Sequence, residues 1–279
     1  MKIIDCRYRP DTEAWLASFR TSPVYARYMR GSALADRPAK SLEQCVAELE
    51  ALNIVRAVIE GRDIESSSAT PSTNALAEAD AAAFPDLFLC ARCYDPWKGM
   101  TAYRAMKDAL AAGRACAAVI EPGMARCPAD DARYYPLYAL CCDVGAPVIV
   151  TAGLAPRLAG VTLDEARPLR LDRVAGDFPD LRLLMSHGGY PFVSEALGVA
   201  LRHENLFLDL SGTTGRPLAE AYARAAAGDL ADRFVFSSAN PFTPAATALR
   251  QAQALGFSAD IREGFFYGNA LRLFKNALA

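Results

Sequence analysis

The amino-acid sequence predicts an α/β protein, a single (β/α)8 TIM barrel that spans residues 1–279. Eight short apolar segments alternate with segments of helical pattern from end to end, which is the number of strands that closes such a barrel. No linker and no internal repeat interrupts this alternation. A doubly wound open sheet is the alternative, but it favours a glycine-rich turn after an early strand, where Pro10 and Asp11 stand instead.

The expected strands are short apolar runs, because parallel strands covered on both faces are hydrophobic throughout. In chain order they span residues 3–8, 54–59, 87–91, 115–120, 147–150, 181–186, 206–210 and 233–237.

The segments between the strands have helical patterns and recognisable starts. Ser41 with Gln44 three residues later forms a capping box, and proline stands at the start of several helices, where no N–H group is needed. Three long irregular stretches, 21–40, 61–72 and 152–170, are expected to build the mouth of the barrel. The expected helices span residues 42–52, 73–83, 97–111, 132–144, 171–177, 191–202, 217–227 and 244–255.

The composition is that of an ordinary globular protein. Hydrophobic residues make up 52%, and 30 Lys+Arg against 32 Asp+Glu give a net charge of −2, so neither nucleic acid nor an anionic membrane is an expected partner. No apolar run approaches the roughly 20 residues that span a bilayer, and the chain starts with a strand instead of a signal peptide. We therefore expect a cytoplasmic protein.

Four segments carry a family signature. They are Asp172-Arg-Val-Ala-Gly-Asp-Phe-Pro-Asp-Leu-Arg, Ser186-His-Gly-Gly-Tyr-Pro, Leu208-Asp-Leu-Ser-Gly and Phe266-Tyr-Gly-Asn-Ala-Leu-Arg-Leu-Phe. With them the chain resembles the amidohydrolase-2 branch of the amidohydrolase superfamily, which includes metal-dependent decarboxylases and hydrolases with TIM-barrel folds. The resemblance covers essentially the whole chain and implies the barrel.

The resemblance also implies where metal ligands would lie, and most of these positions carry other residues. The His-x-His of the first strand falls on Arg7 and Arg9, and guanidinium has no lone pair for a metal. His187 remains on the sixth strand, and one imidazole holds a divalent metal weakly. We expect no metal and no other cofactor. The remaining positions are Thr151 on the fifth strand, Ala239 on the eighth, and Val119 and Glu121 on the fourth.

Arg7 and Arg9 are two residues apart on a strand and should share a face, on which Asp5 is also expected. Two close guanidinium groups need a counter-charge, for which Glu60 and Glu121 are the best candidates. One interpretation is an ion-paired plug. The other is a pocket in which the arginines, with Thr151 and Glu60 nearby, bind a small carboxylate or phosphate.

His187 also has two interpretations. It is either a general acid or base beside Glu121 or Asn240, or a leftover that hydrogen-bonds to backbone. A displaced metal site at His187 with Glu121 or Asn240 would have a poor ligand count.

Two functions follow. The first is a pseudoenzyme or non-catalytic subunit, in a homo-oligomer or paired with a related barrel that keeps its metal. The alternative is a metal-independent hydrolase, lactonase or lyase that acts on a small anionic carboxylate through Arg7, Arg9 and His187.

Overall fold

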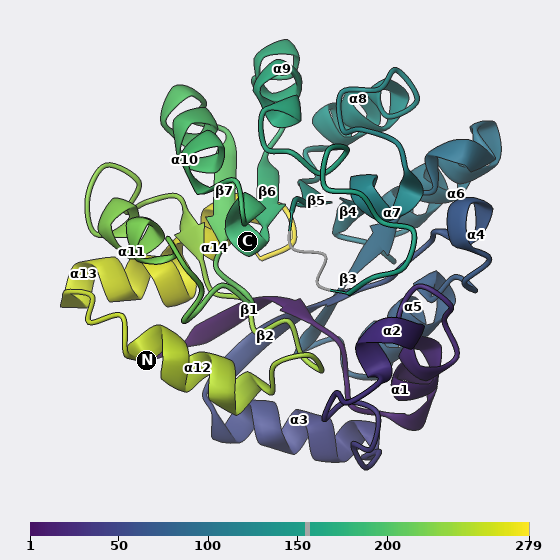
Figure 1. Ribbon diagram of the computed structural model, residues 1–279, viewed down its shortest axis with the longest axis horizontal. Coiled ribbons are helices and arrows are strands. Elements are labelled where there is room, and N and C mark those ends of the chain that lie inside the picture. The colour runs from purple at the N-terminus through teal and green to yellow at the C-terminus, as the bar shows by residue number, and fades with distance from the viewer. Residues whose placement is uncertain (154–156, 279) are drawn as a thin grey trace.

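The computed structural model describes residues 1–153 and 157–278. Eight parallel strands form one sheet in the order β1 to β8, with helices outside it (Figure 1). A hydrogen bond from the Cys6 amide to the Phe236 carbonyl (2.9 Å) joins β1 to the segment after β8. The sheet therefore curls into a barrel, and the predicted fold is confirmed. The strands are β1 (Ile3–Tyr8), β2 (Ile54–Glu60), β3 (Phe88–Cys93), β4 (Ala117–Ile120), β5 (Val148–Thr151), β6 (Leu183–Ser186), β7 (Leu206–Asp209) and β8 (Phe234–Val235).

The helices outside the sheet follow the predicted segments closely. The capping box of Ser41 and Gln44 is present at the start of α3. These helices are α3 (Leu42–Ala51), α5 (Asn74–Ala83), α6 (Met100–Ala111), α8 (Tyr135–Val144), α9 (Arg170–Asp177), α10 (Val193–Arg202), α11 (Glu220–Ala226) and α12 (Ala245–Gln253).

Other helices were not predicted, and two of them fall inside stretches that we expected to be irregular. These are α2, in the stretch 21–40, and α4, in the stretch 61–72. Residues 154–156 of the third stretch lie outside the described residues. The unpredicted α-helices are α1 (Glu13–Arg20), α2 (Ala26–Met29), α4 (Glu65–Ser68), α7 (Pro122–Ala125), α13 (Ala259–Glu263) and α14 (Asn269–Leu273).

The core has two layers, one between the strands and the outer helices and one inside the barrel. Inside the barrel, Ile4, Val58 and Phe207 pack against Leu273 and Phe274, at the end of α14. The chain after β8 thus fills one end of the barrel with apolar side chains. The polar residues that follow the strands gather at the other end.

Strand β1 contains a register shift that changes which of its side chains face inward. Asp5 pairs with Ala57 and Tyr8 pairs with Ile59. An advance of three residues along β1 is therefore paired with an advance of two residues along β2. Ala57 and Ile59 both belong to the outer layer of the core. Arg7 faces inward, as predicted, but the prediction that Asp5 shares its face is wrong, because the bulge lies between them.

No helix in the described part of the chain is long and apolar enough to cross a membrane.

Candidate functional site

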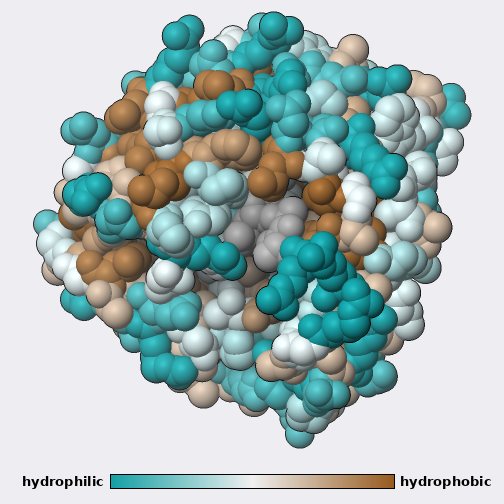
Figure 2. Space-filling view, viewed as in Figure 1, coloured by the Kyte–Doolittle hydropathy of each residue, from teal (hydrophilic) through white to brown (hydrophobic). Residues whose placement is uncertain are grey.

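A cavity of about 510 Å³ opens at the end of the barrel where the strands finish. Figure 2 shows this face, on which both hydrophilic and hydrophobic residues border the centre and hydrophobic residues also gather over α10 and α11. The cavity is lined by Arg7, Tyr25, Tyr28, Gly31, Ser32, Arg62, Met124, Thr151, Arg157, Leu158, His187, Gly212, Arg216, Ala239, Phe242 and Thr243.

The charged side chains of this lining all have the same sign. Four arginines reach the cavity, and none of its described lining residues is an aspartate or a glutamate. Arg7 and Arg62 are buried, Arg216 is partly exposed and Arg157 is exposed. Such a wall attracts anions, because the carboxylates that balance it lie outside the cavity surface.

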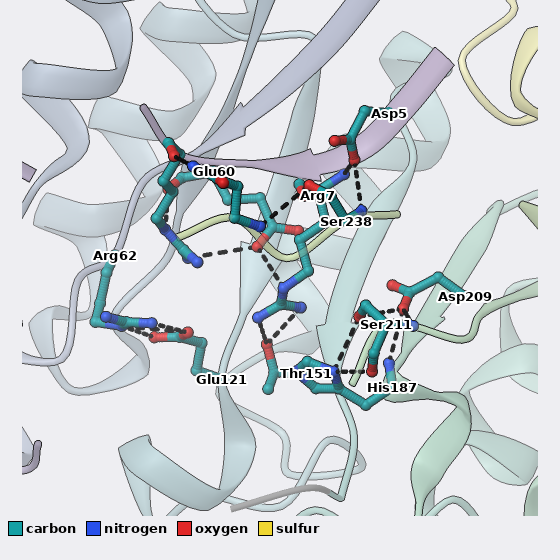
Figure 3. A network of polar contacts seen from close by, with 12 residues as sticks. Asp5, Arg7, Glu60, Arg62, Glu121, Thr151, His187, Asp209, Ser211 and Ser238 are labelled. Carbon is teal, nitrogen blue, oxygen red and sulfur yellow. Dashed lines mark hydrogen bonds and ion pairs between the residues drawn. The ribbon is translucent and has the colours of Figure 1, made fainter. Parts of the chain in front are cut away.

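Glu60, at the end of β2, holds the two arginines of β1. Its Oε2 lies 3.3 Å from Arg7 Nε, as Figure 3 shows. The same oxygen lies 3.4 Å from Arg9 Nη2, and Arg9 Nε donates to the Glu60 carbonyl at 2.8 Å. The prediction of Glu60 as the counter-charge is therefore confirmed. Arg9 lies behind the cavity wall at 1% exposure, whereas Arg7 lines the cavity.

Arg7 retains hydrogen-bonding capacity on the cavity side. Its two terminal nitrogens lie 3.5 and 3.4 Å from Thr151 Oγ1, across the barrel, at the long end of the hydrogen-bond range. A carboxylate would accept from these nitrogens better than a neutral hydroxyl does, because charge-assisted hydrogen bonds are shorter and stronger.

Glu121, just after β4, pairs with Arg62 instead of the β1 arginines. Arg62 Nε and Nη2 donate to both of its carboxylate oxygens at 3.0–3.3 Å, as Figure 3 shows. The guanidinium carbon of Arg62 also lies 4.9 Å from the centroid of the Tyr25 ring. Burial raises the pKa of Glu121, but the charges of Arg62 and Arg9 outweigh it and hold that pKa below its usual value.

The buried charges at this end do not cancel within these pairs. Three guanidinium groups, those of Arg7, Arg9 and Arg62, face the two carboxylates of Glu60 and Glu121. Burial raises the pKa of Glu60, which its two arginines oppose. These pairs therefore contain one more guanidinium group than carboxylate, and the buried carboxylate of Asp209 lies at the same end of the barrel.

His187 follows β6 with its ring fixed by the chain after β7. Its Nδ1 lies 2.8 Å from the Ser211 carbonyl, which can only accept, so Nδ1 carries the proton and a neutral ring keeps a lone pair on Nε2. The His187 amide donates to Asp209 Oδ1 at 3.1 Å, and the Ser211 hydroxyl donates to the same oxygen at 2.5 Å (Figure 3).

The backbone at His187 is also constrained. Its φ of 58° is left-handed, which costs a non-glycine residue roughly 1–2 kcal/mol. Next to it, Gly188 has φ 55°, and a Cβ there would lie 2.9 Å from the Tyr222 ring. The Tyr222 hydroxyl donates to the Gly188 carbonyl at 2.7 Å. These contacts hold the ring at the cavity wall.

His187 is neutral at physiological pH. Burial, and then the charge of Arg7, lower its pKa from 6.5 to about 4. A neutral imidazole with a fixed Nδ1–H and a free Nε2 can accept a proton or a hydrogen bond from a ligand, and it cannot act as a resident acid.

The remaining predicted site residues lie at the same end of the barrel with different surroundings. Thr151 lines the cavity. Asn240 is buried and donates its side-chain amide to the Arg9 carbonyl and to Asp11, at 2.8 and 3.0 Å. It is absent from the described cavity lining, so the structure brings His187 and Thr151 to the cavity and leaves Asn240 behind it.

Several lining residues were missed as site residues. Arg62 lies in the stretch 61–72, which we expected to be irregular, although it follows Glu60 at strand spacing, which could have indicated the inner face. Arg157 and Arg216 lie in long loops whose paths the sequence does not specify. The aromatic residues Tyr25 and Phe242 come from segments that meet only in the folded barrel, with ring centroids 5.7 Å apart.

The residues at the metal positions of the resembled family do not form a ligand set. The guanidinium groups of Arg7 and Arg9 donate hydrogen bonds but have no lone pair for a metal ion. The methyl side chain of Ala239 has no atom that can bind a metal either. Among the described residues, no group of three or more His, Cys, Asp or Glu side chains is placed to hold a metal ion.

The chain was compared with known proteins. The family model described as amidohydrolase matches residues 24–275. A solved structure of an uncharacterised TIM-barrel protein from Bordetella bronchiseptica is 32% identical, with 99% of each chain covered and a TM-score of 0.82. No curated protein matches the chain significantly in sequence.

Two decarboxylases have the same fold at lower identity. The 5-carboxyvanillate decarboxylase from Sphingomonas paucimobilis is 15% identical, with a TM-score of 0.73 and coverage of 98% of this chain and 99% of the other. The 2,6-dihydroxybenzoate decarboxylase from Rhizobium is 16% identical, with a TM-score of 0.72 and 99% of each chain covered.

Proposed function

Since the chain belongs to the amidohydrolase family, we propose that it keeps the family barrel but uses guanidinium groups, in place of a divalent metal, to bind a small organic anion. The observation that carries this proposal is the cavity lined by four arginines, with no carboxylate among its described lining residues. Loss of the metal site is part of the proposal, because Arg7 and Arg9 repel cations where ligands would be needed.

The proposed chemistry is metal-independent cleavage of an anionic carbonyl compound, as in a hydrolase, lactonase or lyase. Arg7 would bind a carboxylate or an oxyanion that develops at the carbonyl, since its terminal nitrogens have only the long contacts to Thr151 Oγ1 in the described part of the chain. His187 Nε2 would take the proton from an attacking water or from the substrate. Arg9 acts indirectly, by sharing Glu60 with Arg7.

The test is calorimetric titration of the purified protein, in buffer with a chelator, with benzoate and with the neutral isostere benzamide. Substituted benzoates are reasonable probes because the two decarboxylases of similar fold are named for them. Benzoate should bind and benzamide should bind at least tenfold more weakly. Arg7→Gln should weaken benzoate about tenfold or more, since one charge-assisted pair is worth about 1.5–3 kcal/mol.

Arg202→Gln is the matched control, because that arginine is 70% exposed on α10 and lies away from the cavity. It should leave benzoate affinity unchanged. Equal affinity for benzoate and benzamide, or equal binding by wild type and Arg7→Gln, would contradict the proposal.

A second candidate is a non-catalytic subunit, as a homo-oligomer or beside a metal-bearing relative. The Arg–Glu pairs favour it, because Glu60 and Glu121 satisfy most of the buried charge without a ligand. Co-expression with a family member that retains His-x-His, followed by size-exclusion chromatography, tests it. Co-elution in a fixed ratio supports this candidate, and separate elution argues against it.

A further inference from the structure

We infer that Asp209 is a positioning residue that acts through Ser211: it decides which nitrogen of the His187 ring carries the proton, and so keeps the Nε2 lone pair available at the cavity wall. This inference rests on the proposed function, in which that lone pair takes a proton. Neither Asp209 nor Ser211 is among the described residues that line the cavity, so their effect on a ligand passes through His187.

Strand pairing places the Asp209 carboxylate next to the His187 backbone. Asp209 is the last residue of β7 and is completely buried, at 0% exposure. Met185 of β6 pairs with Leu208 of β7, so Asp209 lies level with Ser186, the residue before His187. The register of the two strands therefore fixes the position of this carboxylate.

One oxygen of the carboxylate joins the chain after β6 to the chain after β7. Asp209 Oδ1 accepts from the His187 amide at 3.1 Å, from the Ser211 amide at 2.9 Å and from the Ser211 hydroxyl at 2.5 Å (Figure 3). A carboxylate oxygen only accepts, and hydrogen bonds to a charged acceptor are short and strong. The hydrogen bonds that Asp209 makes to described residues thus all go to His187 and Ser211.

The Ser211 hydroxyl also faces the His187 ring, with Oγ 3.0 Å from Nδ1. A hydroxyl group has one proton to donate. Because Asp209 accepts that proton, Ser211 Oγ presents only lone pairs to Nδ1, as the Ser211 carbonyl oxygen does at 2.8 Å. Two acceptors that face Nδ1 require the ring proton on that nitrogen, which leaves Nε2 as the basic nitrogen.

Loss of the carboxylate would release the Ser211 hydroxyl. Its proton could then turn towards Nδ1, which would become an acceptor, and the ring proton would move to Nε2. A proton on Nε2 would prevent that nitrogen from accepting one from a ligand. The Ser211 hydroxyl is therefore the group through which Asp209 acts, and removing both groups together should cancel the effect of removing Asp209 alone.

The test is ¹⁵N NMR at pH 7 of ligand-free protein labelled in its imidazole rings, in a His203→Gln background that leaves one histidine. The parent protein should carry the His187 proton on Nδ1. Asp209→Ala should lower the ratio of Nδ1–H to Nε2–H rings about fivefold or more, because one neutral hydrogen bond changes a ratio by roughly this factor. Asp209→Ala combined with Ser211→Ala should restore the parent ratio, because no hydroxyl remains to donate.

Ser186→Ala is the matched control. It removes another buried hydroxyl beside His187, one with no hydrogen-bond partner among the described residues. Combined with Asp209→Ala, it should leave the lowered ratio unchanged. Asp209→Leu, an apolar side chain with the same branch point, should lower the ratio as Asp209→Ala does, and it replaces that variant if thermal melting shows that the alanine variant is unfolded.

An unchanged ratio after removal of the Asp209 carboxylate would overturn the inference, because the Ser211 carbonyl alone would then place the proton. A ratio that stays low in the variant that lacks both Asp209 and the Ser211 hydroxyl would also overturn it, because the role of Asp209 would then be structural only. Since no ligand is present in this experiment, failure of benzoate to bind would overturn the proposed function and leave this inference standing.

Discussion

At the scale of single residues, the site combines ionisable groups whose burial shifts their pKa values in opposite directions. His187 is kept neutral beside Arg7, and Asp5 is buried and forms no ion pair with any residue that the structure describes. The sequence pointed to His187, but its protonated nitrogen depends on the Ser211 carbonyl, 24 residues further along the chain. A hydrogen bond of this kind requires the fold and could not be predicted from spacing.

His187 should titrate far below an ordinary histidine. Because its folded pKa is about 4 against 6.5, the ring should be neutral, with the proton on Nδ1, at pH 5.5. NMR of protein labelled with ¹⁵N in its imidazole rings measures both the pKa and which ring nitrogen carries the proton. The chain has two histidines, so His203→Gln leaves one signal. A titration near pH 6.5, or a proton on Nε2, would contradict the assigned geometry.

Asp5 should make the protein less stable as pH rises. Burial, opposed by hydrogen bonds from Ser238 and Arg7, raises its pKa from 3.8 to about 7. The folded state therefore holds a proton that the unfolded state loses, and the free energy of unfolding falls between about pH 4 and pH 7.

Asp5→Asn tests this dependence. The asparagine oxygen can still accept from the Arg7 and Ser238 amides, at 3.1 and 2.9 Å in wild type. The variant should be more stable than wild type by about 1–3 kcal/mol at pH 8, with a smaller difference at pH 5. Urea unfolding at both pH values measures this. A variant less stable than wild type at pH 8 would mean that the ionised carboxylate is stabilised.

At the scale of elements, strands β1, β2 and β4 place their charges in register at the end of the barrel. The pairing of Glu60 with Arg7 and Arg9 was predictable, because the ends of neighbouring parallel strands converge. The bulge in β1 could not be predicted in this way. Side chains alternate between the two faces of a strand only while its pairing with the neighbouring strand stays in register. Arg62 was not singled out as a site residue for a related reason, since its partner Glu121 follows a different strand, β4.

Glu60→Gln should be strongly destabilising. Removing its charge leaves Arg7 and Arg9 buried without their shared partner, a change that typically costs about 3–5 kcal/mol. Glu48→Gln is the control, because Glu48 is 56% exposed and, among the residues that the structure describes, forms an ion pair only with Lys40. The free energy of unfolding of that variant should fall by no more than about 1 kcal/mol. Similar losses for both variants, measured by urea unfolding, would show that the inner pair contributes no more than a surface one.

At the scale of the whole molecule, the barrel and the site differ in how far the sequence specifies them. Alternating strands and helices, with strand ends close to those observed, were enough to predict the fold. The cavity was not predictable in the same way. Arg157, Arg216 and the aromatic lining residues come from loops and short helices, whose positions depend on packing over the barrel mouth.

The central claim is that guanidinium groups, and not a metal ion, hold the ligand. A crystal structure of the chelator-treated protein soaked with benzoate tests it most directly. We predict one carboxylate within about 3 Å of the Arg7 terminal nitrogens, at ordinary charge-assisted hydrogen-bond distance. Density for a divalent cation that joins His187 to the ligand would contradict the claim.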